Sequence, residues 1–252
     1  ERYRVGIEPY RKWIAAAIVF GLSFFAGLAG SSEYGSFLLW RNSTPFGQVD
    51  PQFGLDYAFY TFELPFFRFA LGFAFALVIL SLIIVTAVQY LYGGLRLQPK
   101  GDRASRAAQV QLSILLAVLL LLKALAYYLD RFGLVTKSET LVSGFTGLKY
   151  ADVNAVLPAL NILVFVAILV AALFIFNIFR RQWVIPSIGL GLLILTSVVI
   201  GGLYPAIVQQ FQVRPSELVR EAPFIQLNIE ATRDAYGIAD ADVVDYAGSV
   251  SP

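Results

Sequence analysis

The sequence predicts an all-α fold: a polytopic transmembrane helix bundle with five spans in this chain and an outer cap that contains an interfacial helix. Hydrophobic residues make up 58% of the 252 residues and charged residues only 14%, whereas soluble domains average about 45–50% and about 25%. Five stretches reach the length of about 20 apolar residues that a helix needs to cross the hydrocarbon core. Basic residues cluster in alternate connections between these stretches, which is typical of membrane proteins.

The spans divide the chain into three regions. A basic cytoplasmic segment at 1–12 precedes the transmembrane domain at 13–208, and an extracytoplasmic amphipathic segment and linker follows at 209–252. Within the transmembrane domain, residues 31–65 form the outer cap, which is called the cap segment below. The five spans are expected at about 13–30, 66–92, 107–128, 155–179 and 184–208.

Charge predicts the orientation of the spans. Three connections are basic, whereas the cap segment, the connection after the third span and the tail are neutral or acidic. Since Lys and Arg are enriched in cytoplasmic loops, we expect the N-terminus inside and the C-terminus outside. The basic connections carry Arg2, Arg4, Arg11 and Lys12 before the first span, Arg96, Lys100, Arg103 and Arg106 after the second, and Arg180 and Arg181 after the fourth.

The cap segment combines aromatic rings with acids, which fits the boundary between bilayer and water. Its first part, SSEYGSFLLWR, places apolar side chains on one face of a short interfacial helix, and Asp56 is positioned to cap the helix that follows. The predicted aromatic interface consists of Trp40, Phe53, Tyr57 and Tyr60. A cation site at Asp50, Asp56 and Glu63, or an aromatic groove for a lipid or peptide, is the sharper alternative. The acids do not have the spacing of a calcium loop, so no metal site is predicted.

Prolines, small residues and one acid mark the ends and contacts of the spans. Pro65 suits the first helical position of the second span, and Asp152 or Asn154 suits the cap of the fourth. Pro205 is expected to kink or stop the fifth span. The pairs Ser187 and Gly191, and Ser197 and Gly201, predict close approach of helix backbones within the bundle.

Missing residue types exclude many enzyme classes. The chain contains no Cys, His or Met. It therefore has no thiolate nucleophile, no imidazole base, and no thiolate or imidazole ligand for a metal or haem. We accordingly expect no enzyme activity, no catalytic residues and no cofactor, and the net charge of +2 gives no indication of a nucleic-acid partner.

Four ionisable residues are predicted to form an outer-face polar cluster. Lys123 lies inside the third span and Arg68 lies just inside the second, both near the outer surface. An intramembrane charge is a functional candidate, but a side chain this close to the surface can also extend to the headgroups. Asp56 and Glu63 are the expected partners, and these pairs would hold the cap segment on the bundle.

The inner loop between the second and third spans has a second candidate role. Arg96, Lys100, Arg103 and Arg106 could contact anionic lipid headgroups. The simpler interpretation is that they only set the orientation. The loop has no phosphate-binding Gly-Lys-Ser/Thr signature.

The tail predicts short helices that leave the membrane. Pro215 and Pro223 can each start one, and Ile225, Ile229 and Tyr236 then fall on one stripe. Gly237 suits the helix end. Such a helix needs a surface to lie against, which would be an outer domain, a partner subunit or the membrane.

Four stretches carry a family resemblance: NSTPFGQVDPQFGLDYAFYTFELPFFRF, RASRAAQVQLSILLAVLLLLKALAYYLDRF, YADVNAVLPALNIL and IGGLYPAIVQQFQVRPSELVREAPFIQLNIEATRDAYGI. Together they resemble uncharacterised protein family 0182, a family of bacterial multi-pass inner-membrane proteins. The resemblance implies two further spans before this region and a large extracytoplasmic domain after it. The chain then corresponds to the middle of a longer protein, from the third span to the start of the outer region.

Three functions remain open at this stage. The leading hypothesis is an anchor and assembly domain of the bacterial envelope, which presents an outer module or binds partner subunits of a larger membrane complex. The alternative is a transporter of a lipid or other envelope component, with Lys123 or Asn161 exposed in a cavity. The third is a membrane enzyme that acts on lipid-linked substrates, for which two of the acids Asp50, Asp56 and Glu63 would have to converge.

Overall fold

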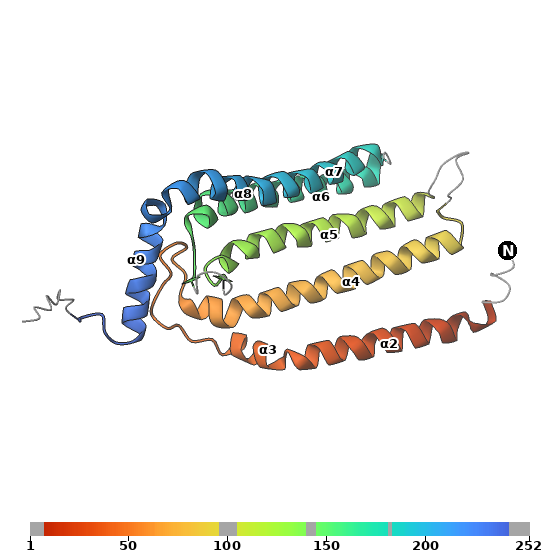
Figure 1. Ribbon diagram of the computed structural model, residues 1–252. Helices are drawn as coiled ribbons and strands as arrows, with labels where there is room; N and C mark the ends of the chain where they lie inside the picture. Colours follow the sequence, from red (N-terminus) through yellow and green to blue (C-terminus); the bar gives the residue numbers. More distant parts are fainter. Residues whose placement is uncertain (1–7, 96–104, 140–144, 181–182, 242–252) are drawn as a thin grey trace, which may run out of the picture. The chain divides into compact units, whose positions relative to one another are not determined.

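The computed structural model describes residues 8–95, 105–139, 145–180 and 183–241. Five of its helices are long and apolar enough to cross a membrane, and the helical fold class predicted from the sequence is confirmed. The chain divides into two compact units, residues 1–74 and 75–252, and Figure 1 shows the helices that compose them.

The first unit contains the first span and the cap segment. Helix α2 begins at the predicted basic boundary, and only Glu33 separates it from the short α3 that the cap sequence predicted. The first span has no buried residue in its most apolar window, so its side chains need apolar surroundings such as lipid. The elements of this unit are η1 (Glu8–Tyr10), α2 (Arg11–Ser32), α3 (Tyr34–Arg41), η2 (Phe59–Glu63) and the start of α4 (Leu64–Leu91).

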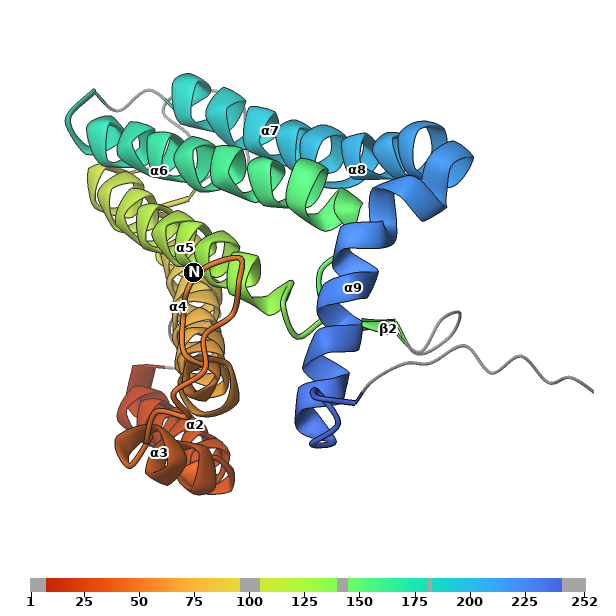
Figure 2. The ribbon, with the colours of Figure 1, turned by 90° about the vertical axis from the view of Figure 1, so that its left-hand side faces the viewer.

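The second unit contains the remaining spans and the tail. Helices α5, α6 and α7 lie side by side in Figures 1 and 2, and α9 turns away from the direction of α7 and α8. Two strands of two residues each form the only sheet among the described residues. The elements are α5 (Arg106–Gly133), β1 (Ser138–Glu139), β2 (Phe145–Thr146), η3 (Asp152–Val156), α6 (Leu157–Arg180), α7 (Val184–Val198), η4 (Val199–Leu203), α8 (Tyr204–Val208), η5 (Gln209–Val213), η6 (Arg214–Ser216) and α9 (Glu217–Ala235).

The core of the second unit lies between α5, α6 and α7. Small residues let these backbones approach: a Cβ added at Gly189 would lie 2.9 Å from Leu173 Cδ1, and one at Gly201 would lie 3.1 Å from Leu163 Cδ1. Gly201 was one of the predicted close contacts, whereas Gly191 faces open space and Gly189 takes its place. The buried members of this core are Ala117, Leu120, Ala124, Tyr127, Leu163, Ala167, Val170, Ala171, Phe174 and Leu193.

Two polar contacts cross the apolar core. Asn177 donates its side-chain amide to Ser113 Oγ at 3.0 Å, and Tyr127 and Ser197 share a hydroxyl hydrogen bond of 3.1 Å. In the low dielectric of a membrane interior, a paired polar group avoids the penalty of an unsatisfied one. These contacts therefore fix which faces of α5, α6 and α7 meet.

The helices accommodate several prolines through π-turns, and the expectations for Pro205 and Pro223 differ from what the structure shows. Pro205 was expected to kink or stop the fifth span, and it does not stop it: the helix continues through η4 into α8. The helical run that contains the fifth span continues from Val184 to Ala235. Since proline lacks an N–H and clashes with the carbonyl four residues earlier, an inserted residue relieves the strain. Pro223 starts no helix but lies inside α9. The described π-turns η2, η3, η4 and η5 each end two residues before a proline, at Pro65, Pro158, Pro205 and Pro215.

Candidate functional site

Asp50 is the organising residue of the cap segment. It is only 1% exposed, and its carboxylate accepts backbone N–H groups from Gln52 at 2.8 Å and Phe53 at 3.1 Å. Tyr60 donates its hydroxyl to the same carboxylate at 2.7 Å. Since these donors occupy both oxygens, Asp50 stabilises the loop from within.

Asp56 caps a helix, as predicted. Its Oδ1 accepts the Ala58 N–H at 2.8 Å and the Phe46 N–H at 2.9 Å, and its Oδ2 accepts the Gly47 N–H at 2.9 Å. These hydrogen bonds, with that of Ala58 first, lower the pKa of the Asp56 carboxyl below its ordinary value of 3.8. Asp56 therefore joins the loop at Phe46 to the start of the helix that leads into α4.

The predicted aromatic residues occupy different environments. Trp40 stacks on Phe66 with ring centroids 4.5 Å apart, which ties α3 to the start of α4. Tyr60 is buried beside Asp50, whereas Tyr57 and Phe53 are half-buried. A lipid-facing role for these four residues stays a prediction.

The four residues of the predicted polar cluster are divided between the two units, with Asp56, Glu63 and Arg68 in the first and Lys123 in the second. Glu63 accepts a long hydrogen bond of 3.4 Å from Ser43 Oγ, and Arg68 is exposed near the start of α4. Lys123 belongs to the second unit, where its ammonium lies 4.3 Å from the centre of the Tyr127 ring. A cation–π contact of this kind stabilises a charge near the membrane, and pairing of Lys123 with the cap acids stays a prediction.

The predicted inner lipid site falls largely outside the described residues. Arg96, Lys100 and Arg103 are not among them, and Arg106 is the exposed first residue of α5. Contact of these residues with anionic lipid stays a prediction.

The second unit contains a site that the sequence did not indicate, at the ends of α5 and α6. We call it the polar end and define it as residues 134–137, 149–156 and 209–221. Asp152 is buried there. Its Oδ1 accepts a hydrogen bond of 3.3 Å from Lys137 Nζ, and its Oδ2 accepts the Lys149 N–H at 3.1 Å. This last contact is the reach-back half of a capping box. Asp152 therefore secures the helix start from inside the first turn, whereas the sequence had predicted it or Asn154 at the cap position itself.

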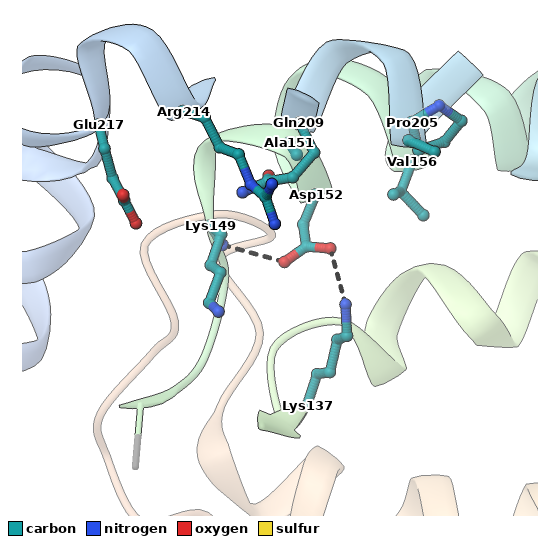
Figure 3. A pocket seen from close by; sticks show the side chains of 10 residues that line it. Lys137, Lys149, Ala151, Asp152, Val156, Pro205, Gln209, Arg214 and Glu217 are labelled. Carbon is teal, nitrogen blue, oxygen red and sulfur yellow. Dashed lines mark hydrogen bonds and ion pairs between the residues drawn. The ribbon is translucent and has the colours of Figure 1, made fainter. Parts of the chain in front are cut away.

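A polar pocket of about 590 Å³ opens beside Asp152. Figure 3 shows the side chains of Lys137, Lys149 and Arg214 around it, with Glu217 lying apart from Asp152 in this view. Cations from three separate segments thus line one cavity, opposite apolar groups of η3 and α8. The lining residues are Lys137, Lys149, Ala151, Asp152, Val156, Pro205, Ala206, Gln209, Arg214 and Glu217.

A second feature of the polar end is the joint between α9 and the bundle. Glu221 is 8% exposed, and its Oε2 accepts the Tyr150 N–H at 3.0 Å. The Arg220 guanidinium hydrogen-bonds to the Tyr150 hydroxyl and lies 4.8 Å from the centre of its ring. Arg220 and Glu221, two consecutive residues of α9, therefore both form hydrogen bonds with Tyr150 at the start of the fourth span.

The comparisons with known proteins identify the family. The profile of the Uncharacterised protein family (UPF0182) matches residues 1–251. The chain belongs to this family. It is 50% identical over 250 residues to the UPF0182 protein SCO5204 of Streptomyces coelicolor, covering 98% of this chain and 25% of that protein. It is 53% identical over 249 residues to the UPF0182 protein FRAAL6027 of Frankia alni, covering 98% and 24%.

The match to this family covers only part of its relatives. The chain spans about a quarter of the length of the curated UPF0182 proteins that it matches. No solved structure matches it. Membership in UPF0182 therefore confirms the predicted resemblance, and it does not name a reaction or a partner.

Sequence reasoning missed most of the polar end in this UPF0182 chain. No local pattern singled out Lys137, Lys149, Arg214 or Glu221. The contact between Tyr150 and Glu221 joins residues 71 positions apart, so no local pattern could reveal it. One signal in the sequence was the adjacent pair of opposite charges, Arg220 and Glu221, in the amphipathic tail segment.

Proposed function

We propose that this chain is an integral membrane anchor and assembly domain of a bacterial envelope protein. The observation that supports this most directly is the joint at Tyr150, where Arg220 and the buried Glu221 fasten α9 to the fourth span. A flexible linker would not be expected to bury a carboxylate such as that of Glu221 against the Tyr150 N–H. The joint instead makes α9 a fixed arm, which suits a domain that presents a module in a defined direction.

The exposed surface of α9 supports the same role. Ile225, Leu227 and Ile229 are 40–46% exposed, and Tyr236 near the helix end is 78% exposed. Gly237 has the positive φ of 67° that a helix end favours, so the arm has a defined end. Apolar side chains on a polar helix outside the spans are typical of a docking surface.

The proposed cellular location follows from charge. By the positive-inside rule the basic connections face the cytoplasm, so the polar end and the cap segment face outward from the inner membrane. The expected partners are membrane lipids and an extracytoplasmic module, which lies either in the same longer chain or in another subunit.

Photo-crosslinking tests the anchor role. A photoreactive amino acid replaces Ile229 in the full-length protein, which is then irradiated in intact membranes and analysed by mass spectrometry. We expect cross-links to peptides of an outer module or of another envelope protein. The Glu221→Ala variant should lose most of them, because the arm is no longer held at Tyr150.

A matched probe at Ile188 serves as the control, since this exposed residue lies in the apolar part of α7 and should cross-link to lipid. If Ile229 also cross-links to lipid alone and the protein purifies without any partner or outer module, the anchor role is wrong.

The other two hypotheses have less support. Transport predicted a cavity with Lys123 or Asn161 inside it, but Lys123 lies over the Tyr127 ring and Asn161 is an exposed residue of α6. The enzyme hypothesis needed two free carboxyls among three cap acids, but Asp50 and Asp56 are engaged by backbone N–H groups. Absence of catalysis stays an expectation.

A further inference from the structure

We propose that one side of α9 binds a single α-helix of the outer module, which lays its own apolar face along the arm. This inference rests on the anchor role proposed above and adds the kind of partner that the arm recognises. The side of α9 in question is called the exposed stripe, and its members are Leu218, Ala222, Ile225, Ile229, Thr232 and Tyr236.

The first observation is the spacing of the exposed stripe. Its members alternate at intervals of four and three residues. Because an α-helix has 3.6 residues per turn, this spacing places all of them on one side of α9. The same alternation is the one by which two helices pack along each other, with side chains of one inserted between those of the other. The stripe therefore matches a helix as its partner.

The second observation is that the stripe is exposed while another side of α9 is held. Arg220 and Glu221 both form hydrogen bonds with Tyr150, which fastens their side of the helix to the fourth span. The two small members of the stripe are exposed. Its large members are also exposed, Ile225 to 40%, Ile229 to 46%, Tyr236 to 78% and Leu218 to 84%.

The third observation is the charge of α9, which favours a protein partner over the lipid surface. The helix contains four acids and two arginines, whereas helices that lie on lipid are rich in Lys and Arg on their polar face. Arg233 borders the stripe, one position before Ile229 and Tyr236 recur on the same side. A partner helix with a carboxylate opposite Arg233 would complement this border.

Leu227 provides a matched control for the stripe. It is 45% exposed, close to the values of Ile225 and Ile229, but it lies about half a turn away from them around the helix. A photoreactive amino acid replaces each of the three in turn in the full-length protein, which is irradiated in intact membranes. We expect protein cross-links from Ile225 and Ile229 to be about tenfold stronger than those from Leu227, since contacts at the centre of an interface dominate binding.

Charged variants test the same contact independently. With the photoreactive residue at Ile229, Ile225→Lys should weaken protein cross-linking about tenfold, because it places an ammonium between two apolar faces. Leu227→Lys should leave cross-linking unchanged. Lysine is a good helix former and both positions are exposed, so thermal unfolding of the two variants should match the wild type.

The cross-linked peptides separate failure of this inference from failure of the anchor role. Partner residues spaced three, four or seven apart would support a helix, whereas a spacing of two would indicate a strand and overturn it. Equal protein cross-linking from Ile225, Ile229 and Leu227 would overturn the stripe and leave the anchor role standing. Cross-links to lipid alone from all three would contradict both.

Discussion

The cap segment buries one carboxylate, Asp50, and the polar end buries two, Asp152 and Glu221. The partners of Asp50 and Asp152 differ in kind. Asp50 in the cap segment is satisfied by neutral donors that lie within ten residues of it, including the Tyr60 hydroxyl. Asp152 at the polar end is paired with a cation, Lys137, from a different element. The neutral donors around Asp50 all belong to the loop that contains it, so they stabilise that loop alone. The ion pair between Asp152 and Lys137 instead joins two separate segments.

The comparison also explains why the two regions differ as candidate sites. Every donor around Asp50 comes from the cap segment, which leaves its carboxylate no capacity for a ligand. At the polar end, pairing of Asp152 with Lys137 leaves Arg214 beside a cavity.

The largest expected effect concerns the side of the membrane on which the two regions lie. The chain has no cysteine, so single cysteines can replace the exposed residues Thr44, Ala107 and Ala231. Thr44 and Ala231 should react with a membrane-impermeant maleimide from outside, because charge places the cap segment and α9 there. Ala107 should react only after the membrane is opened. External labelling of Ala107 would reverse the orientation for both regions.

Loss of Asp50 should be the largest energetic perturbation of the cap segment. Asp50→Ala leaves several backbone N–H groups and the Tyr60 hydroxyl without an acceptor, and each orphaned buried group costs about 1–3 kcal/mol. We expect a local destabilisation of about 3 kcal/mol, seen as faster chymotrypsin cleavage in nanodiscs. Glu63→Gln alters one long contact of 3.4 Å and should cleave at the wild-type rate. Similar rates for both variants would refute the stabilising role of Asp50.

A smaller effect is expected at Asp152. Asp152→Ala removes both the ion pair and the acceptor of the Lys149 N–H, and we expect a loss of about 2 kcal/mol. Lys137→Ala should cost about 0.5–1 kcal/mol, because Lys137 is 44% exposed and solvent screens its charge. Unfolding of the single and double variants in detergent gives the coupling energy. Strictly additive losses would mean that the pair contributes nothing.

The smallest effect is the pH dependence of the cap segment. Backbone hydrogen bonds lower the pKa of Asp56 in the folded state, so its stabilising contribution is complete above the ordinary value of 3.8 and is lost as pH falls below it. With Trp13 and Trp183 replaced by Phe, the fluorescence of Trp40 reports on the cap segment. The change should begin only below about pH 3.8 and should be absent in Asp56→Asn. A transition centred above that value would contradict the lowered pKa.

Local sequence was sufficient wherever the deciding contact lies within a few residues. The runs of apolar residues predicted the five spans, because the hydrocarbon core sets the length of a helix. Asp56 was correctly expected to cap a helix and Gly237 to end one, since both roles depend on adjacent backbone groups. The short helix α3 was found where the cap sequence predicted a helix, and its position in the membrane interface stays a prediction.

Tertiary structure decided everything that depends on residues far apart in the chain. Whether Gly189 or Gly191 meets α6 depends on the rotation of α7, which the spacing of small residues does not specify. Pro205 was expected to kink or stop a span, but the helix continues past it through the π-turn η4, which packs against α6. The hydrogen bond between Glu221 and Tyr150, and the pocket that Lys149 and Arg214 both line, form only when the tail packs against the start of the fourth span. Such contacts depend on two distant segments, so neither segment predicts them alone.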